Sequence, residues 1–149
     1  MKTGFVNSTL DVRTGNGADD ELTEHLDLVR VNGDINRAPS GSFTDGISTP
    51  KIIRILPGFD STGDDWFSGV IHDAGYRGTL LILRKSLIPP YGIPESNFCF
   101  TPANFTQKQC DDMILEAMEL QGVGVIRRHV IYYALRLFGR FAFRKDRRR

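Results

Sequence analysis

The sequence predicts an α+β fold, with a small N-terminal β part followed by about three packed helices. Near the N-terminus, the stretch HLDLVRV (25–31) alternates apolar and polar residues and ends at the turn signal NGD. Later segments place apolar residues at helical spacing, and the last of these is basic and amphipathic. With 149 residues, 40% of them hydrophobic, the chain is long enough for one domain with a modest core.

We expect this single domain to cover residues 21–143. Residues 1–20 are polar and rich in Gly, Asn and Asp, which predicts a flexible N-terminal arm, and residues 144–149 form a basic C-terminal tail. Residues 37–50 form a long loop of Gly, Ser, Pro and Asp, and loops of this length in compact domains are often functional. The segment KIIRILPGF (51–59) fits either a short strand or a helical turn.

The first helix is predicted within residues 61–78, STGDDWFSGVIHDAGYRG. Ser61 or Thr62 can cap its N-terminus, and Gly78 is a suitable C-terminal stop. Its expected apolar face consists of Trp66, Phe67, Val70, Ile71 and Ala74.

Residues 79–104 begin with a predicted strand and continue as a proline-rich loop, with a second short strand near Phe98–Phe100. The next segment, TQKQCDDMILEAMELQG, is the clearest helix. Thr106 and Gln109 form a capping-box pattern at its start, and Gly122 provides a stop. Its apolar residues at helical spacing are Cys110, Met113, Ile114, Ala117 and Met118.

A third helix is predicted at about residues 127–143, and its pattern is that of a basic amphipathic helix. Apolar residues occupy one side, and arginines spaced by multiples of four occupy another. The arginines are candidate contacts for an anion or a partner. The apolar set is Ile126, Val130, Ala134, Leu137, Phe138 and Phe141, and the arginines are Arg128, Arg136, Arg140, Arg144 and Arg148.

The charges are segregated along the chain. Residues 1–126 carry 10 Lys/Arg and 17 Asp/Glu, a net charge of −7, whereas residues 127–149 carry 9 Lys/Arg and 1 Asp, a net charge of +8. An acidic body with a basic C-terminal segment suggests docking to an acidic protein surface, to nucleic acid or to an anionic membrane.

The start of the sequence, MKTGFVNSTLDVRTG, lacks the apolar core of a signal peptide, and the sequence has no run of about 18 apolar residues. We therefore expect a protein made in a cytoplasm, without a transmembrane helix. Cys99 and Cys110 are too few for a disulfide framework and match no zinc spacing, so reduced thiols are expected.

The stretch SGVIHDAGYRG (68–78) holds the residues that could carry chemistry. On a helix, His72 and Tyr76 lie four residues apart and share a face, whereas Asp73 points about 100° away from His72. If the helix with Asp111 and Asp112 packs antiparallel to this one, one of these carboxylates can reach a ring nitrogen of His72. That contact would fix the tautomer and leave the other nitrogen as a base.

Four motifs occur in order along residues 38–143: SFTDGISTP, VIHDAGYRG, QCDDMILEAM and VIRRHVIYYALRLFG. Together they resemble an uncharacterised family common in tailed bacteriophages and prophages. The resemblance implies a virion protein, in or near the tail or injection apparatus, but no proven activity. Cys110 stands where the family pattern has Ala, and the segment 79–104 is longer than the pattern. The motif positions carried over are Thr44, Asp45, Gly46 and Ser48 in the loop, His72, Asp73 and Tyr76 in the first helix, and Asp111 in the second.

The HDxxY helix with a later aspartate is also similar, more weakly, to the secreted calcium-dependent phospholipases. This similarity implies that His72 activates water and Asp111 orients it, while Asp73, joined by Asp45, binds calcium. The chain departs from these enzymes because no glycine-rich calcium loop directly precedes the helix and the cross-linking cysteines are absent. Asp45 also fits a role within a turn.

Two functional classes remain open. In the first, the chain is a structural or assembly protein whose His–Asp cluster fixes helix packing. In the second, it is a hydrolase with His72 as base, acting on phospholipid or peptidoglycan of a host envelope. An enzyme needs His72 to be reachable, with Asp111 on one nitrogen and the other open, whereas a structural cluster buries both nitrogens. A contact between the C-terminal arginines and nucleic acid is a third hypothesis.

Overall fold

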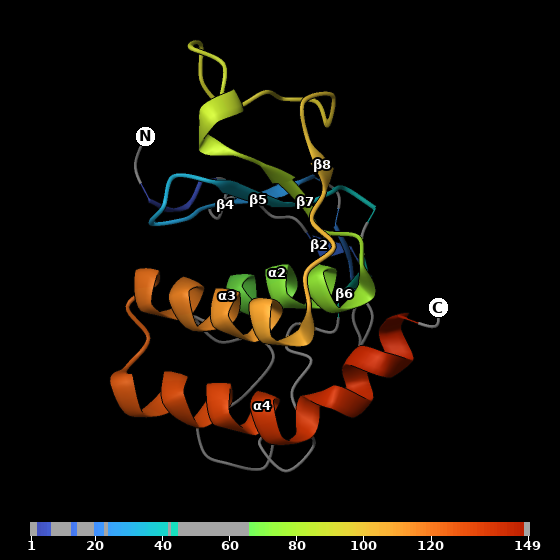
Figure 1. Cartoon of the computed structure of the whole chain (residues 1–149), viewed down its shortest axis with the longest axis vertical. Helices are drawn as coiled ribbons and strands as arrows, with labels where there is room; N and C mark the ends of the chain where they lie inside the picture. The colour runs from blue at the N-terminus through green and yellow to red at the C-terminus, as the bar shows by residue number, and fades with distance from the viewer. Residues whose placement is uncertain are drawn as a thin grey trace.

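The computed structural model describes residues 3–6, 13–14, 20–22, 24–41, 43–44 and 66–147. In this part of the chain, short strands and three helices follow one another, which confirms the predicted α+β class (Figure 1). The elements are β1 (Gly4–Phe5), β2 (Arg13–Thr14), β3 (Asp20–Leu22), β4 (Leu26–Val29), β5 (Ile35–Ala38), β6 (Phe43–Thr44), α2 (Trp66–Arg77), β7 (Leu81–Leu83), the 3-10 turn η1 (Lys85–Leu87), β8 (Thr101–Pro102), α3 (Gln107–Leu120) and α4 (Val125–Arg147).

The main sheet has five antiparallel strands in the order β1-β4-β5-β7-β8, and β2, β3 and β6 form a second, three-stranded sheet. The centre of the main sheet is the hairpin β4–β5. Its turn contains Gly33 at a φ of 94°, a conformation that favours glycine, and the Asn32 side chain accepts a bond from the Asp34 amide at 2.9 Å. The turn signal NGD therefore sits where the sequence predicts it.

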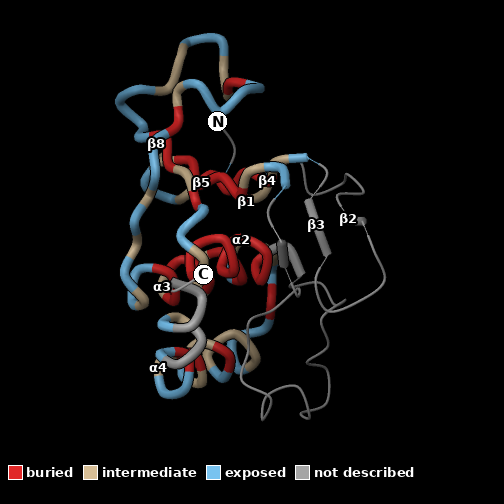
Figure 2. The backbone as a smooth tube through the Cα atoms, turned by 90° about the vertical axis from the view of Figure 1, so that its right-hand side faces the viewer, coloured by how far each residue is buried: buried red, intermediate tan, exposed pale blue. Residues whose placement is uncertain are grey.

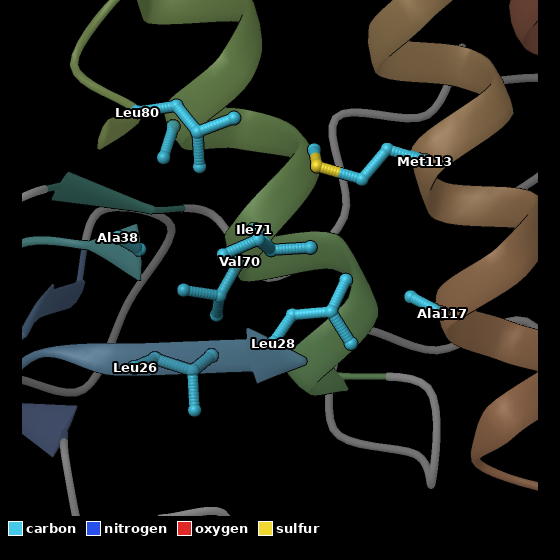
Figure 3. Close-up of a cluster of buried hydrophobic side chains, with 9 residues drawn as sticks. Leu26, Leu28, Ala38, Val70, Ile71, Leu80, Met113 and Ala117 are labelled. Carbon is cyan, nitrogen blue, oxygen red and sulfur yellow. The ribbon is translucent and has the colours of Figure 1, made fainter. Parts of the chain in front are cut away.

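Both faces of the β4–β5 hairpin are covered, and alternate residues enter two different cores. Leu26 and Leu28 on β4 and Ala38 on β5 pack against Val70, Ile71 and other residues of the helices (Figure 3). The intervening residues Val29 and Ile35 pack on the other side, with Leu83, Phe100, Ile88 and Ile93. This alternation follows from the two-residue period of a strand.

The helices form two further layers beneath the main sheet. In Figure 1, α2 and α3 lie next to the sheet and α4 lies beyond them. Figure 2 shows that α2 is the most enclosed helix, and every residue from 68 to 76 is buried. A functional group on α2 therefore lies in the middle of the protein.

The local helix signals agree with the structure. Thr106 caps α3 by accepting a bond from the Gln109 amide, and the Gln109 side chain accepts the Thr106 amide in return. Gly122, which follows α3, has a φ of 80°, and Gly78, which follows α2, has a φ of 78°. All five apolar residues predicted for α3 are buried.

Other expectations differ from the structure. The predicted N-terminal arm contains β1, which pairs with β4. The short strand expected near Phe98–Phe100 is β8, three residues further along, because its register is set by pairing with β7. The last helix runs from Val125 to Arg147 and so continues into the predicted basic tail. The segment 51–59 and the predicted caps Ser61 and Thr62 lie outside the described residues.

The last helix also differs in which side it buries. Its core residues are Ile131 and Leu135, whereas most of the predicted apolar side, including Ile126 and Leu137, faces solvent.

Among the described residues, no helix is both long and apolar enough to cross a membrane.

A buried arginine, Arg37, holds the proline-rich loop within residues 79–104 against the sheet. Arg37 on β5 lies opposite Asp27 on β4 and donates to both of its carboxylate oxygens, at 2.7 and 2.9 Å. The remaining Arg37 donors reach the carbonyls of Pro94 and Ser96 and the side chain of Asn97. The guanidinium also stacks 3.9 Å from the centre of the Phe100 ring. The long segment 79–104 is therefore a cover for one sheet face.

Replacing Arg37 with Met should strongly destabilise the fold, because it leaves the Asp27 carboxylate buried without its arginine. We expect a loss of about 3–5 kcal/mol in the free energy of unfolding, measured by urea denaturation. Arg84→Met, at an exposed position, is the control and should change stability little. A loss below about 1 kcal/mol for Arg37→Met would contradict the anchoring role.

Candidate functional site

The Asp111 side chain on α3 is fully buried and accepts hydrogen bonds from two other helices. Its Oδ1 atom lies 2.9 Å from Nε2 of His72 and accepts a bond from the Tyr76 hydroxyl at 2.6 Å, and both of these residues are on α2. Its Oδ2 atom accepts a bond from Nη1 of Arg136 on α4 at 3.1 Å. One carboxylate thus joins all three described helices.

His72 is held in one orientation by this contact. Because a carboxylate only accepts hydrogen bonds, Nε2 is assigned as the proton-bearing nitrogen. In a neutral ring, Nδ1 then carries a lone pair, and among the described residues this atom has no hydrogen-bond partner. The His72 side chain is nevertheless fully buried, and so is Nδ1. Both ring nitrogens are therefore enclosed, and only one of them is bonded.

Tyr76 completes the cluster as a hydrogen-bond donor. Its ring lies 4.0 Å from the His72 ring, centre to centre, as expected for residues one helical turn apart. Burial and then the hydrogen bond to Asp111 raise the pKa of the Tyr76 hydroxyl far above its ordinary value. Tyr76 therefore stays protonated and continues to donate to Asp111.

Gly139 lets α4 approach the cluster closely. A Cβ atom at this position would lie 2.5 Å from the Tyr76 hydroxyl oxygen, so any other residue would collide with a buried group. Next to it, Gln107 at the start of α3 donates to the carbonyl of Leu135 at 3.2 Å. Because position 139 is glycine, α4 can lie this close to α2 without displacing the Tyr76 hydroxyl from Asp111.

The neighbour of Asp111 has a different role. The Asp112 side chain is partly exposed, and it accepts bonds from Lys108 at 2.7 Å and from the Tyr132 hydroxyl at 2.7 Å. Partial burial opposes ionisation here, but these two bonds outweigh it and lower the pKa of the Asp112 carboxyl. Of the two adjacent aspartates, Asp111 is the one that reaches His72.

The loop motif is only partly within the described residues. Thr44 ends strand β6, whereas Asp45, Gly46 and Ser48 lie outside the described part of the chain. Asp73, the expected calcium ligand, is fully buried on α2. Within the described residues, no three His, Cys, Asp or Glu side chains gather as a metal site, whereas calcium takes six to eight oxygen ligands. The described donor set does not fit calcium.

The arginines of the predicted stripe lie in different surroundings. Arg136 enters the Asp111 cluster, and Arg128 donates to the carbonyl of Val123 at 3.1 Å. Arg140 and Arg144 are exposed, and Arg148 lies outside the described residues. The reason is geometric: four residues turn a helix by about 400°, so arginines four residues apart are displaced by about 40°, and Arg128 and Arg136, eight residues apart, by about 80°.

Two surface hollows lie away from the cluster, and neither is lined by His72, Tyr76 or Asp111. The first is polar, with a volume of about 300 Å³, and lies between the sheet and the start of α3. The second is a shallow apolar hollow of about 580 Å³ along α4. Neither gives access to His72.

Comparison with known proteins places the chain in a family without assigning an activity. Residues 21–135, more than three quarters of the chain, match the family described as "Protein of unknown function (DUF1353)". The chain belongs to this family. No curated protein and no solved structure matches it. The family description names no reaction, so it assigns no chemistry to the His72 cluster.

Two residues of the Asp111 cluster were not expected there from the sequence. Arg136 was assigned to an anion or partner contact, and Gly139 was not singled out. Both lie on α4 and fall within the fourth sequence motif, but their roles depend on how that helix crosses α2 and α3, which the motif does not specify. The sequence offers two signals for Gly139: it ends the fourth motif, VIRRHVIYYALRLFG, and it is a helix-disfavouring glycine within an otherwise helical segment.

Tyr76→Phe should destabilise the protein by about 1–3 kcal/mol, because the buried Asp111 carboxylate loses a donor. The matched control is Tyr91→Phe, since Tyr91 is 79% exposed and should tolerate loss of its hydroxyl. Chemical denaturation of both variants measures the difference. Equal stability of the two variants would show that the Tyr76 hydroxyl is dispensable.

Gly139→Ala should also destabilise the protein, although alanine favours a helix over glycine by about 1 kcal/mol. The added methyl group would displace the Tyr76 hydroxyl from Asp111. Gly124→Ala is the control, because a Cβ atom there meets nothing within 4 Å. A lower melting temperature for Gly139→Ala alone is the expected result, and a rise in its melting temperature would refute the close approach.

Proposed function

We propose that this DUF1353 protein is a structural or assembly protein, in which the His72–Asp111–Tyr76 cluster fixes helix packing rather than carrying out a reaction. The observation that carries this proposal is the burial of the cluster. His72, Tyr76 and Asp111 are each fully buried, and a general base must come within hydrogen-bond reach of the proton that it removes. A buried, paired charge network that joins three helices suits a packing role.

The setting we propose is the virion of a tailed phage or prophage, in or near the tail or injection apparatus. The support is the ordered set of four sequence motifs that resembles a phage-associated family. The charge distribution is consistent with it, because a body of net charge −7 followed by a segment of net charge +8 suits docking among other virion proteins. Immunodetection of the chain in purified particles tests this setting, and its absence from particles would refute it.

One observation favours a second candidate, a hydrolase. The Asp111 carboxylate holds Nε2 of His72 while Nδ1 has no partner among the described residues, which is how a histidine base is oriented. In such an enzyme, His72 would remove a proton from water and Asp111 would stabilise the charged ring. The substrate would be phospholipid or peptidoglycan of a host envelope.

A hydrolysis assay separates the two candidates. Purified protein would be incubated with phospholipid vesicles and with peptidoglycan, each with calcium or with chelator. We expect wild type to show no more turnover than His72→Ala, and we expect the variant to unfold more readily because Asp111 loses a bonding partner. Turnover that disappears in both His72→Ala and Asp111→Asn, while the variants remain folded by circular dichroism, would establish the hydrolase instead.

A further inference from the structure

The helix α4 has two different apolar faces. The inward face contributes Ile131 and Leu135, which pack with Ile114 and Met118 of α3. The outward face consists of large apolar side chains in solvent: Ile126 is 82% exposed, Leu137 68% and Tyr133 60%. With Val130 between Ile126 and Tyr133, successive members of the outward face lie three or four residues apart, so they form one continuous stripe.

This outward stripe lines a shallow, almost wholly apolar hollow of about 580 Å³. Scattered single apolar residues are normal on a protein surface, but a contiguous patch of this kind usually marks a contact site. We define the outer face of α4 as the residues that line this hollow: Val125, Ile126, His129, Val130, Tyr133, Ala134, Leu137 and Phe138.

The charged residues of α4 itself are all positive up to Lys145. No Asp or Glu occurs between Val125 and Lys145, whereas this interval contains five arginines and Lys145 itself. By helical geometry, the exposed residues Arg140 and Arg144 continue the line of the outer face beyond Leu137. The outer face is therefore apolar over its first turns and cationic over its last turns.

We propose that the outer face of α4 lies on the surface of an anionic phospholipid bilayer. A helix with an apolar stripe and arginines beside it binds in the plane of a membrane interface, where the apolar side chains enter the acyl boundary and the cations contact lipid phosphates. Tyr133 suits that position because its ring is apolar and its hydroxyl is polar.

The position of α4 in the fold allows this contact. Among the described elements, this helix forms the outermost layer, on the side of α2 and α3 away from the main sheet (Figure 1). Its inward face is already fixed by packing and by the Arg136–Asp111 bond, so binding would not require α4 to leave the protein. The contact is independent of whether His72 is catalytic.

Other occupants fit less well. Two copies that paired through the same face in an isologous dimer would bring arginines of one copy near arginines of the other. Double-stranded nucleic acid offers phosphates but no surface for the apolar stripe. A bilayer rich in anionic lipid supplies both an apolar interior and negative charge, which matches the two halves of the outer face.

Vesicle co-sedimentation of the full chain tests the proposal. We expect binding to vesicles of mixed phosphatidylcholine and phosphatidylglycerol, and much weaker binding to phosphatidylcholine alone. Leu137→Glu should weaken binding roughly tenfold or more, because it places a charge where an apolar side chain is buried in lipid. Ile126→Glu should act in the same way.

The matched control is Leu87→Glu. Leu87 is 64% exposed, close to the exposure of Leu137, but it lies in η1 above the opposite side of the sheet, so the variant should bind as wild type does. Circular dichroism confirms that each variant is folded. Equal binding of Leu137→Glu and Leu87→Glu would overturn the proposal.

The charge contribution is tested separately. Arg140→Gln and Arg144→Gln should each lower binding to anionic vesicles by roughly fivefold at low salt, whereas the exposed Arg84→Gln should not. Raising the salt concentration should reduce these differences.

Absence of vesicle binding by wild type would refute the membrane contact, and two further results would then identify another occupant. A dimer in analytical ultracentrifugation that Leu137→Glu dissociates would assign the outer face to self-association. Retention on nucleic acid that Leu137→Glu leaves unchanged would assign the arginines to nucleic acid.

Discussion

The interior of this protein depends on one buried carboxylate. Asp111 enters the core from α3 and is stabilised there by a hydroxyl and an imidazole from α2 and by a guanidinium from α4. A buried carboxylate is costly unless it is paired and hydrogen-bonded, so each of these helices must keep its position for Asp111 to keep its partners. Gly139 allows the required approach of α4, and the protonated Tyr76 supplies a donor that does not ionise. The helical layers are therefore specified by polar geometry as well as by apolar burial.

A second buried ion pair serves the sheet in a similar way. Arg37 and Asp27 face each other across β4 and β5, and the guanidinium holds the proline-rich loop by its backbone carbonyls. The Asp111–Arg136 and Asp27–Arg37 pairs lie on opposite sides of the sheet. The first fixes the position of α4, and the second fixes the proline-rich loop. This arrangement helps to hold the two apolar clusters on the two faces of the main sheet in place, although the strands of this chain of 149 residues are short.

The same helix that completes the Asp111 cluster presents an apolar and cationic face to solvent. Inward and outward faces of α4 therefore have separate roles: the first stabilises the fold, and we propose that the second contacts an anionic bilayer. If the chain is a virion component near an injection apparatus, as we propose, such a contact would place it at a membrane surface. If His72 were also catalytic, its substrate would then lie nearby. The burial of His72 favours packing, whereas the Nδ1 atom, which has no partner among the described residues, is the feature that favours the hydrolase hypothesis.

The sequence by itself determined the features that depend on neighbours along the chain. It predicted the α+β class, the capping box of Thr106 and Gln109, and the glycine stops after α2 and α3, because these arise from bonds within one or two turns. It also placed His72 and Tyr76 on one helix face, and the family motif selected Asp111. Only the tertiary structure decided which side of α4 is buried, why Arg136 leaves the arginine stripe, and why a long loop covers the sheet. These outcomes depend on how distant elements cross and which charges they enclose, and no spacing within a single segment encodes that geometry.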